Sequence, residues 1–236
     1  MLKFNVHSLT PVKESGGGGG TGGTYRIMQR VKDDSNNEIG TVCGFFIDSD
    51  DNEYAVVCLD AVYRAAALQV CDYGNSLNQY RTIPVIDIPM LYCDNTTATA
   101  NTTDMLNAAV AWAADVEQET GEVVEITSPA ANFCRSKQFT IGGVTYYGQL
   151  PTFREIMDIM LYYTEINNAD PTASSNPDLA FGGHEEPYED YYAGMWTSST
   201  GWNGSACLKY GYQPDTTFAE GQDEFFVAPI LELPNQ

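Results

Sequence analysis

Apolar runs of strand length dominate the first third of the chain. Residues 38–47 and 54–59 are rich in β-branched and aromatic side chains, and a polar stretch at residues 48–52 separates them, which predicts a β-hairpin. The polar stretch has the composition of a calcium loop. It lacks the later Gly and Glu that an EF-hand loop requires, so we interpret it as a hairpin turn.

A helical pattern occupies residues 104–119. Apolar side chains recur there at helical spacing, which predicts an amphipathic helix with Thr103 or Asp104 as its N-cap. The expected inward face consists of Leu106, Val110, Ala113 and Val116, with Trp112 at its flank.

A second helix is predicted for residues 153–166. Thr152 and Glu155 stand just before and inside its first turn with the spacing of a capping box, in which each side chain accepts a hydrogen bond from the other residue's backbone N–H. Its inward side chains are expected to be Ile156, Ile159, Met160 and Tyr163.

The rest of the second half predicts short strands. We expect one around residues 123–126, a hairpin around residues 141–144, and further strands at residues 195–199, 206–212 and 225–233. Trp196 stands in a run of small hydroxyl residues, Met-Trp-Thr-Ser-Ser-Thr, which is typical of a strand that enters a core.

The charge balance excludes two classes of partner. The formal net charge is −21, and after Arg154 the only cation is Lys209, against fourteen Asp and Glu residues. Nucleic-acid binding requires clustered cations, and an anionic membrane surface repels such a chain, so neither partner is expected. No apolar run is long enough for a transmembrane helix.

The six cysteines have no CxxC spacing; they are Cys43, Cys58, Cys71, Cys93, Cys134 and Cys207. Their even number allows three disulfides. We favour free buried thiols, because Cys43 and Cys58 lie within apolar strand patterns and the first residues lack the apolar region of a Sec signal peptide. The protein is therefore expected in the cytoplasm where it is made, or in a particle assembled there.

Residues 1–24 are predicted to be an N-terminal anchor, followed by one domain over residues 25–236. The anchor's apolar residues are Leu2, Phe4, Val6 and Leu9, and the first three alternate with polar residues as in an edge strand. A glycine-rich linker follows at residues 16–23. Such a strand on a tether can dock onto another subunit by strand addition, and a disordered tail is the alternative. The domain divides into a β-rich part, 25–95, and a part with the helices and closing strands, 96–236.

Three motifs occur in a characteristic order. They are Gly148-Gln149-Leu150-Pro151-Thr152-x-x-Glu155, Trp196-Thr-Ser-Ser-Thr200 and the closing Val227-Ala228-Pro229-Ile230-Leu231. Together with the hairpin that begins at Ile39, they resemble the bacterial and phage "major paralogous" family of C-type-lectin-like domains, over about residues 25–234. The chain departs from the family where Ala228 replaces an Arg of the closing motif.

The resemblance implies an α+β fold of the C-type-lectin-like type. Two helices would pack on a twisted antiparallel sheet, the first and last strands would pair, and long loops after the second helix would form a variable face. Four residues are then expected to hold the fold: Thr152, Glu155, Trp196 and Pro229. Recognition is expected on the loops, around residues 167–194 and 200–224.

Aromatic residues gather in those expected loops. The candidate contacts for a sugar or a protein are Tyr191, Tyr192, Trp202, Asn203, Tyr210 and Tyr212. Residues 213–215, Gln-Pro-Asp, resemble a triplet of calcium-dependent lectins, and residues 184–190 are strongly acidic. We favour a turn and a solvated loop for these two segments, so no metal or cofactor is expected, with Ca²⁺ as the alternative.

The sequence has none of the spacings of catalytic residues that would indicate an enzyme. It therefore predicts a non-enzymatic protein of a bacteriophage virion, a head or tail fibre or a decoration protein, assembled in the host bacterial cytoplasm. Residues 1–24 would bind other virion proteins, and a homo-oligomer would present the lectin-like domain to a host glycan or surface protein. The alternatives are a capsid or tail assembly protein with no ligand, and a hydrolase or oxidase acting on surface polymers.

Overall fold

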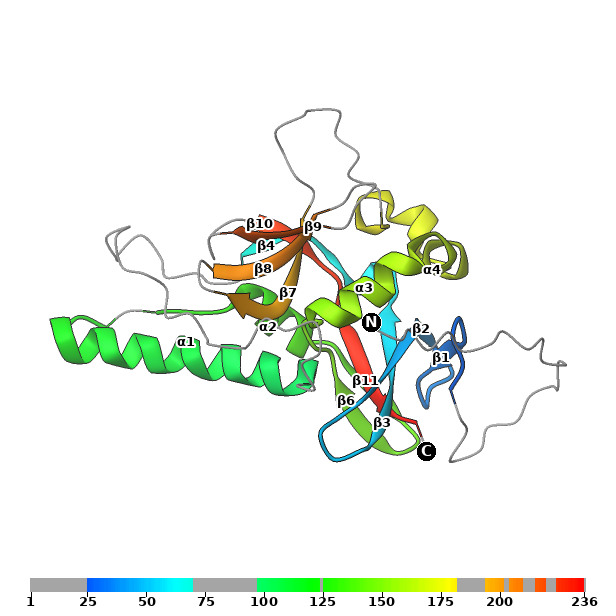
Figure 1. Ribbon diagram of the computed structural model, residues 1–236, viewed down its shortest axis with the longest axis horizontal. Helices are drawn as coiled ribbons and strands as arrows, with labels where there is room; N and C mark the ends of the chain where they lie inside the picture. The colour runs from blue at the N-terminus through cyan, green and yellow to red at the C-terminus, as the bar shows by residue number, and fades with distance from the viewer. Residues whose placement is uncertain are drawn as a thin grey trace, which may run out of the picture.

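The computed structural model describes residues 25–69, 97–123, 125–181, 194–201, 204–209, 215–219 and 224–235. The anchor predicted for residues 1–24 lies outside these ranges. The described chain is a mixed α+β structure with several largely antiparallel sheets (Figure 1). None of its helices is long and apolar enough to cross a membrane.

The first sheet contains the predicted hairpin and the end of the chain. Its strand order is β1 (Arg30–Lys32), β2 (Glu38–Ile47), β3 (Glu53–Leu59) and β11 (Ile230–Pro234), with every pair antiparallel. The predicted polar turn is confirmed, because the Asp48 carboxylate accepts the backbone N–H groups of Asp50 and Asn52, each at 2.9 Å. Among the described strands the last one pairs with β3 and not with β1, unlike the pairing that the family resemblance implies.

The second sheet has the order β4 (Ala65–Gln69), β10 (Glu224–Val227), β7 (Gly194–Gly201), β8 (Gly204–Lys209) and β9 (Asp215–Ala219). Strands β10 and β7 run parallel, and the other pairs are antiparallel. The strand predicted at residues 195–199 is confirmed within β7, whereas β9 was not predicted.

A small hairpin packs beside the first sheet. It consists of β5 (Gln138–Ile141) and β6 (Val144–Tyr147), as predicted, and its turn residues Gly142 and Gly143 have φ of 61° and 77°, a region that favours glycine. The two glycine N–H groups donate to the carboxylate of Asp34 at 2.7 and 2.8 Å. The turn between β1 and β2 thereby fixes the hairpin to the first sheet.

The closing stretch is two strands, so the prediction of one strand over residues 225–233 was wrong. Pro229 has no N–H to donate to a ladder, and the chain leaves the second sheet after β10 and enters the first as β11. The Pro229 carbonyl still accepts the N–H of Leu59 at 3.1 Å. Pro229 thus marks the point where the chain joins the two sheets.

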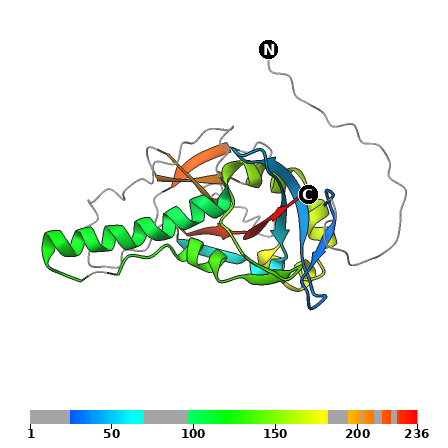
Figure 2. The same ribbon diagram turned by 90° about the horizontal axis from the view of Figure 1, so that it is seen from below.

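Helix α1 (Ala98–Thr120) begins earlier than predicted. Its N-cap is Thr97, whose hydroxyl accepts the N–H of Ala100 at 3.0 Å, and neither Thr103 nor Asp104 caps it. Its C-terminal end extends beyond the sheets (Figures 1 and 2). The predicted inward face was partly wrong: Val116 is buried, but Val110 is 70% exposed, because the buried side of α1 follows Met105, Ala109, Trp112 and Val116 instead.

The short strand predicted around residues 123–126 was wrong. Val123, Glu125 and Ile126 belong to no strand, and Val123 is 83% exposed. The chain continues into an unpredicted helix, α2 (Pro129–Arg135), which starts with Pro in a first-turn position where no N–H is needed. Helix α2 packs against α1.

The second predicted helix is broken into α3 (Phe153–Leu161) and α4 (Tyr163–Ala169). The backbone leaves the helical region at Tyr162, with φ of −122° and ψ of 17°. Ile156 and Ile159 are buried as predicted, and Met160 is partly buried, but the break turns Tyr163 outward and leaves it 41% exposed. Three short 3₁₀ turns complete the described chain: Ala61–Tyr63, Ala173–Ser175 and Pro177–Leu179.

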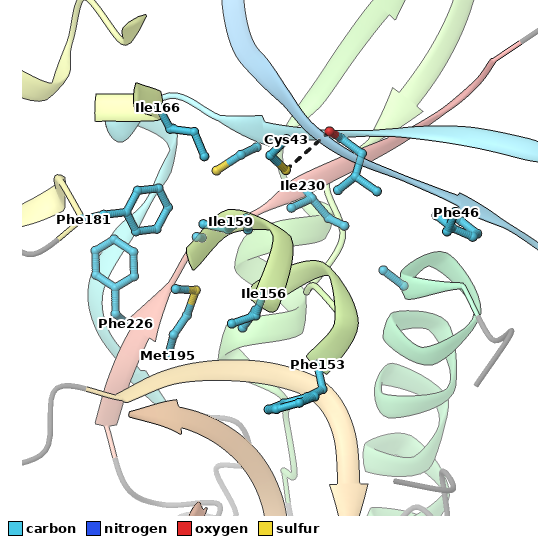
Figure 3. Close-up of a cluster of buried hydrophobic side chains, with 14 residues drawn as sticks. Cys43, Phe46, Phe153, Ile156, Ile159, Ile166, Phe181, Met195, Phe226 and Ile230 are labelled. Carbon is cyan, nitrogen blue, oxygen red and sulfur yellow. Dashed lines mark hydrogen bonds between the residues drawn. The ribbon is translucent and has the colours of Figure 1, made fainter. Parts of the chain in front are cut away.

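A hydrophobic core joins α3 to both sheets. Figure 3 shows Ile156 and Ile159 of α3 within a cluster that also holds Cys43 of β2, Ile230 of β11 and Met195 of β7. At one end of this cluster the rings of Phe181 and Phe226 are tilted against each other, with centroids 5.8 Å apart. Helix α3 therefore connects the β2–β3 hairpin to the strand that carries the Trp-Thr-Ser-Ser motif.

We expect Gly44→Ala to be destabilising, because α3 approaches the backbone of β2 closely. A Cβ at Gly44 would lie 2.2 Å from Oδ2 and 3.0 Å from Cβ of Asp158. The free energy of unfolding should fall by about 1–3 kcal/mol, as for other insertions into a packed core, and urea denaturation would measure it. In an Asp158→Ala background part of this loss should disappear. An equal loss in both backgrounds would show that the two residues do not compete for space.

Candidate functional site

Two of the three sequence motifs, and Glu232 that directly follows the third, contribute to a buried group of polar side chains, which we call the polar junction. Its members are Asn101 and Thr102 of α1, Thr152 and Glu155 at the start of α3, Ser198 and Ser199 of β7, and Glu232 of β11. All of them are at most 9% exposed. Polar groups this deeply buried are stable only when they are hydrogen-bonded, so their partners define the role of each motif.

The Leu-Pro-Thr segment is bonded to the Trp-Thr-Ser-Ser strand. The Ser198 N–H donates to the carbonyl of Pro151 at 2.7 Å, and the Phe153 N–H donates to the hydroxyl of Ser199 at 3.1 Å. The hydroxyl of Thr102 accepts the Leu150 N–H at 3.0 Å, which ties α1 to the same segment. These bonds explain why a strand in the core carries hydroxyl residues.

The predicted capping box is confirmed. Oε2 of Glu155 accepts the Thr152 N–H at 2.7 Å, and the Thr152 hydroxyl accepts the Glu155 N–H at 3.4 Å. Glu155 is fully buried, unlike most capping-box residues. Burial first, and the neighbouring charge of Glu232 second, raise the pKa of Glu155 well above its ordinary value.

Glu232 binds the N-terminal end of α1. Its carboxylate accepts the N–H of Ala98 at 2.7 Å, and the N–H and hydroxyl of Thr99 at 3.0 and 2.5 Å. The first N–H groups of a helix have no partner within the helix, and its positive end favours an anion. This pairing is the physical reason why α1 begins at Ala98.

Asp158 and Arg154 of α3 lie at the edge of this region. The Arg154 guanidinium is 4.6 Å from the centre of the Phe46 ring. Partial burial raises the pKa of Asp158 to about 6, and the charge of Arg154 opposes that shift. Asp158 therefore gains its proton at a mildly acidic pH.

A buried ion pair lies at the C-terminal end of α4, where Asp170 is the C-cap. The side chains of Arg64 and Asp170 are both 0% exposed, and Nη2 of Arg64 lies 3.6 Å from Oδ2 of Asp170. The guanidinium also donates to the carbonyls of Leu59 and Leu179 at 2.9 and 3.1 Å, and it stacks 4.0 Å from the ring centre of Phe181. This arrangement joins the end of β3 to the segment after α4.

A second ion pair holds the edge of the first sheet. Arg30 of β1 donates two hydrogen bonds of 2.6 Å to the two carboxylate oxygens of Asp60 and one of 2.9 Å to the hydroxyl of Thr41. Burial outweighs the pull of Arg30 and raises the pKa of Asp60. Like the first pair, it connects elements of the framework.

The described cysteines are free. Cys43, Cys58 and Cys134 are buried and unpaired, as predicted for these three positions, and the other three cysteines are not described or lie where only the backbone is described. Burial raises the pKa of the Cys58 thiol to about 11, so it is protonated at neutral pH. The thiol of Cys43 donates a weak hydrogen bond to the carbonyl of Val56 (Figure 3).

The described residues do not bring together three His, Cys, Asp or Glu side chains that could hold a metal ion. Among the described buried acids, Glu232 and Glu155 accept hydrogen bonds from backbone N–H groups, and Asp170 is paired with Arg64. The predicted acidic run at 184–190 and the Gln-Pro-Asp triplet at 213–215 fall on residues that are largely not described.

The predicted contact residues were not placed by the structure. Tyr191, Tyr192, Trp202, Asn203, Tyr210 and Tyr212 all lie outside the described residues, as do the anchor residues Leu2, Phe4, Val6 and Leu9. In the chain, Trp202 and Asn203 fall between Gly201 of β7 and Gly204 of β8, which are paired with each other. Recognition by these residues remains a prediction.

Trp196 is the largest fully buried side chain among the described residues, in agreement with its predicted place in the core. Its indole N–H donates to the carbonyl of Leu68 at 2.7 Å, and its ring meets Phe225 edge-on, with centroids 4.8 Å apart. Trp196 therefore joins β7 to β4 and β10.

Sequence reasoning missed Glu232, Arg64 and Asp170. The position of Glu232 in the apolar closing stretch Ile-Leu-Glu-Leu was a usable signal, because a single carboxylate in a core strand needs a partner. Arg64 and Asp170 carried no local signal, since their partners are distant in the sequence.

Comparison with protein-family models, with curated proteins and with solved structures finds no match to this chain.

Proposed function

We propose that this protein is a non-enzymatic surface protein of a bacteriophage virion, which presents a C-type-lectin-like domain for attachment to the host. The observation that carries the proposal is the polar junction. The Leu-Pro-Thr segment, the Trp-Thr-Ser-Ser strand and the closing strand, which together resemble the "major paralogous" motifs, converge there on Glu155, Ser198 and Glu232. Motif residues that bond to one another in the core are expected to stabilise the fold.

The arrangement of elements supports the lectin-like fold. The long β2–β3 hairpin and the closing strand β11 share one sheet, and α1 and α3 lie between them in the sequence and pack on β7 (Figure 1). The family's closing Arg is absent, and Ala228 is fully buried in its place. Here the end of the chain is held by Pro229 and Glu232.

Attachment is favoured over catalysis because three of the described buried acids are occupied within the framework. Glu232 binds a helix end, and Asp170 and Asp60 bind arginines. Recognition then falls to segments outside the framework, among them the link between β7 and β8 with Trp202 and Asn203. Aromatic side chains there would stack on a sugar ring or anchor in a protein surface.

The anchor completes the proposal. Residues 1–24 would bind another virion protein by adding a strand to it, and the glycine linker would let the domain reach the host surface. Oligomerisation on the particle would multiply a weak affinity per domain.

The test of attachment is binding of the labelled full-length protein to host cells and to a glycan array, with and without EDTA. We expect Trp202→Ala to lower binding about tenfold or more, as for a hot-spot aromatic, without changing the melting temperature. The matched control is Tyr163→Ala, since Tyr163 is a partly exposed aromatic on α4. Equal binding by wild type and Trp202→Ala would contradict the assigned contact, and no binding at all would favour a purely structural virion protein.

The test of the anchor is deletion of residues 1–24. The truncated domain is expected to remain folded and to lose incorporation into the particle. Incorporation of the truncated protein would show that the anchor lies elsewhere. Release of products from a surface polymer by the purified protein would support the hydrolase alternative and overturn the non-enzymatic proposal.

A further inference from the structure

Two carboxyl groups in the polar junction have very different hydrogen-bonding environments. Glu232 accepts three hydrogen bonds, from the N–H groups of Ala98 and Thr99 and from the Thr99 hydroxyl. Both carboxylate oxygens of Glu232 therefore have hydrogen-bond partners, and both face the positive end of α1.

Glu155 has a single donor for two oxygens. Its Oε2 accepts the Thr152 N–H at 2.7 Å, whereas its Oε1 is buried and has no hydrogen-bond partner among the described residues. The side chain is 0% exposed. An ionised Glu155 would therefore place a second buried negative charge beside Glu232, with one oxygen unsatisfied.

The charged and titratable groups described around this pair come from α3, α2 and the first sheet, and α1 and β7 present hydroxyl and amide side chains to it. The charged and titratable groups are Arg154 and Asp158 of α3, Arg135 of α2, Cys43 of β2 and Tyr54 of β3. Arg154 opposes the shift of Glu155, but burial and the charge of Glu232 are the larger influences and its pKa is raised well above 4.5. Arg135 is turned towards α1, where it donates to the hydroxyl of Thr103 at 2.7 Å.

We propose that the buried Glu155 side chain is a neutral carboxylic acid beside Glu232, and that loss of its proton as the pH rises releases the N-terminal end of α1 from the polar junction. We call the Glu155–Glu232 pair a latch, because the proton on Glu155 keeps α1 bound to Glu232. The proposal is independent of the proposed function.

Release of α1 is expected because Glu232 binds the first N–H groups of this helix. When the Glu155 proton passes to solvent, two adjacent buried anions repel each other across a poorly screened interior. Glu232 is fixed through β11 to the first sheet, and it binds α1 through backbone N–H groups that water can replace. The remaining described bonds of this end of α1 to the junction are those of Thr102 with Leu150 and of Asn101 with Ser198.

The direction of the pH effect is set by the raised pKa. An exposed Glu155 in the released or unfolded state titrates near 4.5, and in the closed state it titrates at a higher pH. The stabilisation of the closed state by the protonated Glu155 side chain is complete below pH 4.5. It declines as the pH rises to the pKa of Glu155 in the closed state. Asp158 adds a similar decline in stability, which ends near pH 6. Exposed thiols begin to ionise near pH 9. A decline in stability between pH 6 and pH 9 therefore reports on Glu155.

The first measurement is a carbon-13 NMR titration of the glutamate side-chain carboxyls in the full-length protein. We expect one carboxyl signal to be that of a neutral acid at pH 7, and Glu155→Gln to remove that signal alone. The titration is recorded on the wild-type protein, and the Glu155→Gln variant assigns the signal. If all glutamate carboxyls are ionised at pH 7, the proposal is overturned.

The second measurement is the protection factor of the amides of residues 98–102 against hydrogen exchange, between pH 6 and pH 9. We expect wild-type protection to fall by up to about tenfold per pH unit, since one proton is released on opening, and Glu155→Gln to keep its protection across the interval. The matched control is Asp158→Asn on the same helix, which should keep the wild-type slope above pH 6. Wild type and Glu155→Gln with the same pH profile would overturn the latch.

Discussion

Asp170→Ala is expected to lower the free energy of unfolding by about 3–5 kcal/mol, the largest effect of any single change at a charged residue described above. Its carboxylate balances the fully buried guanidinium of Arg64 and accepts the Ala61 N–H at 2.6 Å. It also accepts the N–H and the hydroxyl of Thr172 at 2.8 and 2.7 Å. Alanine would leave the charge of Arg64 and two N–H groups without this partner, and urea denaturation followed by circular dichroism would measure the loss.

The control for this prediction is Asp178→Ala. Asp178 is an exposed acid in the 3₁₀ turn that follows, so its removal should change the free energy of unfolding by less than about 0.5 kcal/mol. The double variant Arg64→Met/Asp170→Ala should recover part of the loss, because it leaves no unpaired buried charge. If the two single losses simply add in the double variant, Arg64 and Asp170 are not coupled.

Trp196→Ala is expected to cost about 3–5 kcal/mol of folding free energy, through the cavity that it leaves between α1 and the second sheet. The side chain is 0% exposed and belongs to the cluster that holds Met105, Leu150 and Val227. Trp196→Phe should cost less, about 1–3 kcal/mol, because the ring is largely kept while the carbonyl of Leu68 loses its 2.7 Å donor. Thermal unfolding followed by circular dichroism would rank the two variants.

The control for Trp196 is Val110→Ala on the exposed side of α1, which should change stability by less than about 0.5 kcal/mol. A comparison of Trp196→Ala with Trp202→Ala also distinguishes a residue that stabilises the fold from a residue that contacts the host. The first should destabilise the domain, and the second should reduce binding with the fold intact. A stable Trp196→Ala variant would contradict the placement of this residue in the core.

Local patterns in the sequence correctly predicted the elements whose stabilising bonds are local. The Asp48 turn and the Thr152–Glu155 capping box bond within about four residues, and the Gly142-Gly143 turn links the paired residues Ile141 and Val144; over this range residue identity determines geometry. The buried face of α3 was predicted for the same reason. Its boundary with α4 was not, because the break at Tyr162 follows no proline or glycine.

The helix α1 shows why other boundaries could not be predicted. Its start at Ala98 depends on Glu232, which lies 134 residues away in the sequence. Val110 has the spacing of an inward residue, but the side of α1 that packs against the core runs through Met105, Ala109 and Val116, and Val110 lies outside it. An amphipathic pattern indicates which face can be buried, and the neighbouring elements decide how much of it is.

By itself, the sequence determined that this is an α+β chain of strong negative charge, with a β-hairpin, a capped helix and a Trp-bearing core strand in that order. The tertiary structure alone decided that Pro229 passes the chain from one sheet to the other, that Arg64 meets Asp170, and that Glu155 lies beside Glu232. The physical reason is that burial removes water as a partner, so a buried charge must find another group wherever the fold brings one close. Such partners are far apart in the sequence, by more than a hundred residues for Ala61 with Asp170 and for Ala98 with Glu232, and no short pattern encodes them.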